Sequence, residues 1–248
     1  MKTVKSITKK AAIVLLVATI LAGCGTIQPQ RFGKNASGAV IDTTLVDEDG
    51  TTTIDNSLLS QALEKIPAGE LSEAEANALI FMREEEKLAH DVYVALGDIW
   101  GLNIFSNISQ SEATHTDAVK NLIDRYGLSD PAADKAPGEF VNAELQELYN
   151  QLVAQGSQSL ADALRVGATI EDLDIVDLRT RIAQTERSDI QLVYENLMKG
   201  SRNHLRSFTK TLAKQTGESY QPQYLEQAEF DAIINSDMER GQGQGKGR

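Results

Sequence analysis

The stretch that decides the fold of this chain is Ser109-Gln110-Ser111-Glu112-Ala113-Thr114-His115. It lies within a helical pattern and places Glu112 and His115 three residues apart, on one face of a helix. The other residues on that face are apolar or aromatic: Ile108, Val119, Leu122 and Tyr126. Such a face is expected to enter the core, where an uncompensated charge is costly. The stretch therefore predicts a core helix whose carboxylate and imidazole are compensated, most simply by a metal ion.

The composition of the whole chain agrees with a globular protein that has a substantial core. The chain has 248 residues, of which 41% are hydrophobic, and a formal net charge of −12. An acidic chain repels phosphate backbones, which argues against nucleic acid and favours cations as partners. There is one cysteine, Cys24, so an intrachain disulfide is excluded.

The first residues have the pattern of an exported lipoprotein. Four lysines lie within residues 1–10, residues 11–22 form a short apolar run, and Leu21-Ala22-Gly23-Cys24 follows. The run is too short for a comfortable transmembrane helix, and its end resembles a bacterial lipobox. We therefore expect residues 1–23 to be a signal peptide and Cys24 to carry a lipid anchor in the bacterial cell envelope, facing the periplasm or the cell surface. A plain signal peptide that contains a cysteine is the alternative.

The rest of the chain divides into three parts. Residues 24–70 are rich in Gly, Ser, Thr, Asp and Asn, which predicts a flexible tether. Residues 57–66 within it could form one or two helical turns before Pro67. Residues 71–236 carry helical periodicity and form the expected helical domain. Residues 237–248 include a low-complexity run of Gly and Gln, and we expect a disordered tail.

The helical domain is expected to contain four long helices in two hairpins. Ser72 and Glu75 form a capping box at the start of the first helix, and Gly127 follows the second. The four ranges are about 72–100, 103–126, 157–184 and 188–214. Shorter helices are expected at 142–154, in the long crossover between the hairpins, and at 224–234.

Each long helix carries metal-ligand residues near the middle of its inward face. They are Glu86 in the first, Glu112 and His115 in the second, Glu171 and Asp174 in the third, and His204 in the fourth. Core faces ordinarily carry few charges, so four such faces together predict one shared metal site. For Glu112 and His115 taken alone, a buried hydrogen-bonded pair or a solvent-facing pair is the alternative.

The order and spacing of these residues resemble the ferritin-like superfamily of carboxylate-bridged dimetal proteins, in which two helices give one Glu each and two give Glu-x-x-His. The matching residues are Glu86 with Ala89 and Tyr93, as in a rubrerythrin-type first helix, then Glu112 with His115, Glu171, and His204. Two further phrases are similar to a bacterial ferritin-like family of unknown function: Arg83-Glu-Glu-Glu-Lys-Leu-Ala and Gly200-Ser-Arg-Asn-His-Leu-Arg. The resemblance covers roughly residues 71–234.

The resemblance implies an all-α fold, an antiparallel four-helix bundle with a short extra helix in its crossover. It also implies two metal ions, iron by preference, with manganese or zinc as alternatives. The ligands would be Glu86, Glu112, His115, Glu171 and His204, with Asp174 as an auxiliary ligand. The chain departs from the pattern at Ser201, where a second Glu-x-x-His needs Glu. Either Asp174 supplies the missing oxygen, or the second ion is held weakly.

The function implied by the resemblance is that of a dimetal oxidoreductase acting on Fe(II), dioxygen or peroxide. Metal binding without turnover and a structural lipoprotein role stay open, as do the catalytic residues and a homodimer. Around the predicted site, His90 is expected at the surface and Glu84 and Glu85 on a solvated face, with an inward Glu85 as the alternative if the helix phase shifts by one position. Arg202 and Arg206 flank the last histidine and are expected to pair with the site carboxylates.

Overall fold

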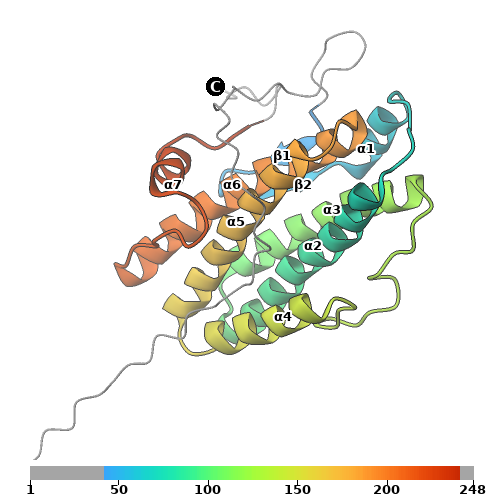
Figure 1. Cartoon of the computed structure of the whole chain (residues 1–248). Coiled ribbons are helices and arrows are strands. Elements are labelled where there is room, and N and C mark those ends of the chain that lie inside the picture. The colour runs from blue at the N-terminus through green and yellow to red at the C-terminus, as the bar shows by residue number, and fades with distance from the viewer. Residues whose placement is uncertain (1–41, 241–248) are drawn as a thin grey trace, which may run out of the picture. The chain divides into compact units, whose positions relative to one another are not determined.

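The computed structural model describes residues 42–240, and within this range the chain is almost entirely helical. The strands are β1 (Thr44–Val46) and β2 (Thr52–Ile54). The helices are α1 (Asn56–Leu63), α2 (Glu73–Trp100), α3 (Asn103–Arg125), α4 (Ala143–Gly156), α5 (Leu160–Ala183), α6 (Ser188–Thr216) and α7 (Gln227–Ile234). The all-α class expected from the sequence is confirmed (Figure 1).

Several expectations fall outside the described range. The signal peptide, the lipid attachment at Cys24 and the beginning of the expected tether lie in residues 1–41, and most of the expected tail lies in residues 241–248. Export and anchoring therefore stay predictions. Among the helices of residues 42–240, none is both long enough and apolar enough to cross a membrane.

Local sequence sets the ends of the long helices. At the start of α2, the Ser72 side chain accepts a hydrogen bond from the Glu75 backbone, and the Glu75 side chain accepts one from the Ser72 backbone, as expected. Gly101 ends α2 and Gly217 ends α6, with φ angles of 62° and 74° that favour glycine. Caps of this kind are readable from the sequence, so the helix boundaries agree closely with the expected ranges.

The four long helices form two closely packed pairs (Figure 1). A link of only two residues turns α2 back along α3, and α5 lies along α6. Helix α4 packs against α2 and α5, and α7 packs against α6. Aromatic contacts join the pairs inside the core: the ring of Phe208 (α6) lies 5.1 Å from that of Tyr93 (α2) and 5.8 Å from that of Phe105 (α3), between centroids.

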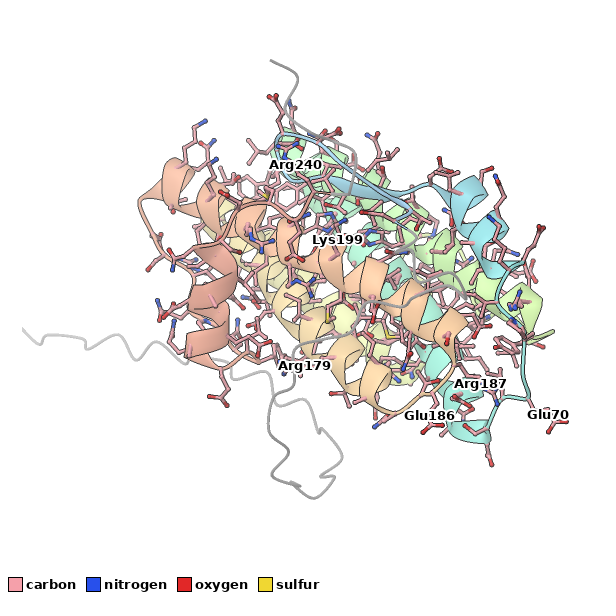
Figure 2. The ribbon with its side chains drawn as sticks, turned by 90° about the horizontal axis from the view of Figure 1, so that it is seen from above. Glu70, Arg179, Glu186, Arg187, Lys199 and Arg240 are labelled. Atoms are coloured by element: carbon pink, nitrogen blue, oxygen red, sulfur yellow. The ribbon has the colours of Figure 1, made fainter. Side chains whose placement is uncertain are left out.

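Polar ties hold the connections to the helices (Figure 2). Arg187, between α5 and α6, donates to the backbone oxygen of Glu70 ahead of α2 at 2.6 Å. Arg179 of α5 forms an ion pair with Glu229 of α7. Side chains from α5 and from the link after it therefore hold the segment ahead of α2 and the last helix, α7.

The segment expected to be a tether contains a strand hairpin that was not expected, and α1 where one or two helical turns were expected. Strands β1 and β2 form an antiparallel hairpin in which Val46 pairs with Thr52, and Gly50 takes a φ of 93° in the turn. Asp55 then caps α1, and the hairpin packs against α3 and α6. Lys199 of α6 holds the hairpin through the side chain of Thr44, at 2.6 Å (Figure 2). Strands of three residues are too short to show an alternating pattern, which explains why composition alone suggested a tether.

We expect Gly167→Ala to lower the free energy of unfolding by about 1–3 kcal/mol, the usual cost of overpacking. A Cβ at Gly167 of α5 would lie 2.4 Å from Cε1 of Phe208, which has no space to move. Gly97→Ala is the matched control, because its Cβ would only approach Phe105 Cβ at 3.3 Å and alanine favours the helix. Urea unfolding of both variants measures the difference; equal stability would contradict this account of the α5–α6 contact.

Candidate metal centre

The structure brings together five of the six ligand residues that the sequence predicts. Glu86 comes from α2, Glu112 and His115 from α3, Glu171 from α5 and His204 from α6. None of the five is more than 2% exposed. They form two groups of three whose ligand atoms lie within 4.8 Å of one another, and Glu112 belongs to both groups.

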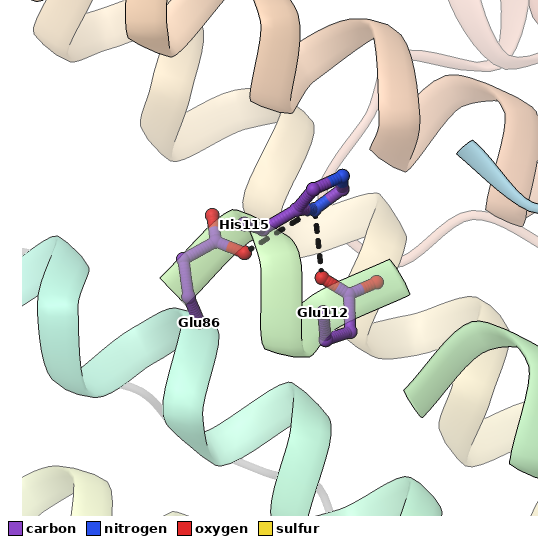
Figure 3. A group of neighbouring side chains, drawn as sticks. All are labelled: Glu86, Glu112 and His115. Carbon is purple, nitrogen blue, oxygen red and sulfur yellow. Dashed lines mark ion pairs between the residues drawn. The ribbon is translucent and has the colours of Figure 1, made fainter. Parts of the chain in front are cut away.

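The first group is Glu86, Glu112 and His115 (Figure 3). Nδ1 of His115 lies 2.9 Å from Oε2 of Glu112 and 3.6 Å from Oε2 of Glu86. Gly200 of α6 makes room for this imidazole, because a Cβ at that position would lie 2.4 Å from Cε1 of His115. The ring is therefore packed between α3 and α6 with Nδ1 turned to two carboxylates.

The second group repeats this arrangement on the other side of Glu112. Nδ1 of His204 lies 2.8 Å from Oε1 of Glu112 and 3.6 Å from Oε1 of Glu171. The hydroxyl of Tyr93 donates to the same Glu171 oxygen at 2.6 Å. The two imidazole rings are stacked with their centroids 5.5 Å apart. One carboxylate thus lies between two imidazoles, with one oxygen toward each.

The charges in this cluster shift the ionisation of its members. Burial alone would raise the pKa of Glu112, but the two imidazoles outweigh burial and hold the pKa well below its ordinary value. Burial disfavours the charged form of His204, yet Glu112 and Glu171 raise its pKa to about 9. The pKa of His115 is also raised, against burial, chiefly by Glu112. Burial raises the pKa of Glu86 to about 7.

The outer nitrogen of His115 is held by the hairpin, a contact that the sequence did not predict. The backbone oxygen of Thr52 in β2 lies 2.8 Å from Nε2 of His115, which fixes the ring with Nδ1 facing the carboxylates. The Thr52 N–H also lies 3.3 Å from Nε2 of His204. This long contact needs an unprotonated Nε2, and the raised pKa of His204 favours the protonated ring instead. The contact with His115 is therefore the one that positions a ligand.

The central stretch of α3 carries two interleaved pairs of residues. Glu112 and His115 face the cluster, while Ser111 and Thr114 face the hairpin. The hydroxyl of Ser111 donates to the Thr52 backbone oxygen, and the hydroxyl of Thr114 accepts from the Ile54 backbone at 2.8 Å. The same five residues therefore supply both the ligands and the anchor of the strand that orients one of them.

Asp174 lies beside the cluster and outside both groups of three. It is buried, one oxygen accepts a hydrogen bond from the Ser201 hydroxyl, and the other has no hydrogen-bond partner. Burial and the nearby Glu86 raise its pKa well above the ordinary value. Ser201 stands where the ferritin-like pattern has a glutamate. It thus contacts Asp174, the carboxylate expected to replace that glutamate.

Four neighbouring expectations need correction. Glu84 and Glu85 were expected on a solvated face, yet both are buried: Glu84 accepts from the backbone of the loop ahead of α4, and Glu85 lies against α5. Arg202 and Arg206 bind Glu239 near the end of the described chain instead of the site carboxylates. The two glutamates are buried because α2 packs against α3, α4 and α5, so more than one face of this helix is covered. His90 is half-exposed, in keeping with the expectation that it lies outside the site.

The chemistry of the donors fits metal ions. Three carboxylates and two imidazoles are the ligand types of iron, manganese and zinc sites. Oε1 of Glu86, Oε1 of Glu112 and Nδ1 of His204 are buried and have no hydrogen-bond partner. The last two atoms lie only 2.8 Å apart without hydrogen-bond geometry. Unsatisfied buried polar atoms are rare in proteins, and one cation in each of the two groups would satisfy all three atoms.

Fold and site define a helical protein whose core contains two overlapping carboxylate–imidazole groups, each able to hold a metal ion. Residues 75–237 match the family described as "Uncharacterized protein domain (DUF2202)", and the chain belongs to this family. It is 51% identical over 179 residues to "Uncharacterized protein MJ0754" of Methanocaldococcus jannaschii, covering 72% of this chain and 96% of the relative. A crystal structure described as "hypothetical protein MJ0754" from Methanococcus jannaschii DSM 2661 has a TM-score of 0.68 and 52% identity, covering 70% of this chain and 99% of that one.

We expect the metal-free protein to lose stability as pH rises from about 6.5, the ordinary histidine pKa, to about 9, the pKa of His204. A raised histidine pKa means that folding favours the protonated ring, so this stability is complete below 6.5 and is lost as the folded protein deprotonates. Urea unfolding with a chelator at pH 6.5 and 9 measures it. His204→Gln should flatten this dependence and His90→Gln should leave it unchanged; an equally steep fall in His204→Gln would contradict the assignment.

Proposed function

We propose that this protein is a ferritin-like metal protein that holds two ions in its helical core and acts as an oxidoreductase on Fe(II), dioxygen or peroxide. The observation that carries the proposal is the position of Glu112, whose two oxygens lie 2.9 Å and 2.8 Å from the Nδ1 atoms of two different histidines. A carboxylate between two ligand groups is the arrangement that bridges a pair of ions. The four long helices that supply the residues support the ferritin-like relationship.

In this proposal one ion is held by Glu86, Glu112 and His115, and the other by Glu112, Glu171 and His204. Iron is the preferred metal, with manganese and zinc as alternatives for the same donors. Asp174, held by Ser201, is the auxiliary ligand in place of the carboxylate missing at position 201. A pair of redox-active ions held in this way supplies electrons to an oxidant or takes them from a substrate ion.

The protein's own residues would position the ligands and keep water away. The Thr52 backbone orients His115, and the Tyr93 hydroxyl holds one oxygen of Glu171. The ring of Phe208 packs against those of Tyr93 and Phe105, and all three rings are fully buried. Such a dry, rigid surrounding strengthens the interaction of carboxylates with a cation.

Metal content is the first test of the proposal. We expect protein purified without chelators to bind two equivalents of Fe(II) under anaerobic conditions, the second more weakly if Asp174 does not fully replace a glutamate. Glu112→Ala should impair both sites, because this carboxylate faces both histidines. His90→Gln removes the one histidine outside the cluster and should bind as the wild type does. Equal metal binding by the wild type and by Glu112→Ala combined with His115→Ala would refute the site.

Turnover is the second test. We expect the protein to oxidise added Fe(II) in air faster than buffer alone, and we expect Glu112→Ala to remove the difference. Stopped-flow absorbance of the Fe(III) product measures the rate, with His90→Gln as the control. Tight binding of metal without faster oxidation would favour the second candidate function, metal binding without catalysis. Ser201 favours this candidate, because it stands where the ferritin-like pattern has a glutamate.

A further inference from the structure

The buried polar atoms without a hydrogen-bond partner are not spread through the described residues. Seven side-chain atoms are in this state, and three belong to the metal centre described above. The other four are Oε2 of Glu85, Oδ1 of Asp174, Nε of Arg181 and the hydroxyl of Tyr194. These four residues lie on α2, α5 and α6, on one side of the centre. Within residues 42–240, the other buried side-chain nitrogen and oxygen atoms have hydrogen-bond partners. In this range, the unsatisfied atoms outside the centre belong to these four residues alone.

An acidic row on α5 leads away from the centre through this region. Glu171, Asp174 and Asp177 follow one another at intervals of three residues, so each lies about 60° around the helix from the one before, and together they span about 9 Å along its axis. Glu85 lies on α2, which packs against α5, and the charge of Asp177 acts on it. Burial, followed by the charges of Glu86 and Glu85, raises the pKa of Asp174. The row therefore leads from Glu171 of the centre to the half-buried Asp177, which lies one turn before Arg181 on α5.

A small hollow of about 20 Å³ opens at the surface between α2, α5 and α6, and its lining includes Arg181, one turn beyond Asp177 on α5. It is lined by Ala78 of α2, Arg181 of α5 and Tyr194 of α6, among others. The Tyr194 hydroxyl is buried and unpartnered, and burial raises its pKa, with smaller contributions from the charges of Glu85 and Glu86. The hollow is just large enough for one water-sized particle.

Arg181 is the cation of this row, and its nearest carboxylate contact is Asp177 at 3.9 Å. Within residues 42–240, Glu85 and Asp174, each 8% exposed, form no ion pair, although the charge of Arg181 acts on Glu85. Buried carboxylates with free oxygens attract a hard divalent cation, which prefers oxygen ligands. Because the centre itself is almost fully buried, an ion must also cross one of the layers of helices to reach it.

We propose that Glu85 and Asp174 form a further cation-binding position, through which divalent ions pass from the hollow at Ala78, Arg181 and Tyr194 to the metal centre. This inference rests on the proposed function, since it assumes that the centre takes up ions. This further position is separate from the two ligand groups of the centre, because neither group contains Glu85. The role of the further position is to lower the barrier to ion uptake. Final occupancy of the centre does not depend on it.

The test measures the rate at which the full chain, stripped of metal, takes up Co(II) under anaerobic conditions, using stopped-flow visible absorbance. Glu85→Gln keeps the shape of the side chain and removes its charge, and we expect uptake to slow at least tenfold with unchanged final stoichiometry. Ala78→Leu narrows the hollow without touching an acid, and we expect a similar slowing. Circular dichroism confirms that each variant folds; if Glu85→Gln does not, Ala78→Leu decides alone.

The control lies at the other candidate opening, a surface hollow of about 490 Å³ beside the hairpin, lined in part by Glu48 and Asp49. Glu48→Gln should take up Co(II) at the wild-type rate. Uptake by Glu85→Gln and Ala78→Leu within twofold of the wild type would overturn the proposal, as would slowing confined to Glu48→Gln. A wild-type protein that takes up no Co(II) at equilibrium would instead refute the proposed function itself, so the two failures are distinguishable.

Discussion

The constraint on which the rest of the structure depends is the burial of Glu112 between two imidazoles. A carboxylate removed from water is stable only if its charge is compensated in place. Here each oxygen lies within 2.9 Å of an imidazole nitrogen, and one imidazole comes from α3 itself and the other from α6. The two helix pairs must therefore meet at one defined depth and rotation, because a shift of either would leave a charge unpaired in the core.

The close packing around the cluster follows from this constraint. Gly200 lets α6 approach the His115 ring, and Gly167 lets α5 approach Phe208, so glycine stands at two positions where a Cβ would meet a buried ring. The helix interior ordinarily disfavours glycine by roughly 1 kcal/mol relative to alanine. Keeping it at these two positions indicates that the short distance between helices matters more than local helix stability.

Most of the fold was predictable because its signals are local. The capping box at Ser72, the glycine ends and the apolar periodicity fixed the positions of the long helices, and ligand residues at similar depth indicated that Glu86, Glu112, His115, Glu171 and His204 would meet. The contact between the hairpin and His115 was not predictable, because the backbone oxygen of Thr52 makes it. Such a contact does not depend on the type of side chain, so the sequence carries no signal for it. The burial of Glu84 and Glu85 was missed for another reason: periodicity assigns one inward face, whereas α2 is covered by α3, α4 and α5.

The hairpin also bears on where this domain begins. The segment that matches the family starts at residue 75, whereas the backbone oxygen that orients His115 belongs to residue 52. A chain limited to the matched segment would retain every carboxylate and imidazole of the cluster. It would nevertheless expose the outer edge of His115 and leave the Ser111 hydroxyl without its acceptor. The functional unit therefore extends at least 23 residues ahead of the boundary that sequence similarity draws, the difference between positions 75 and 52.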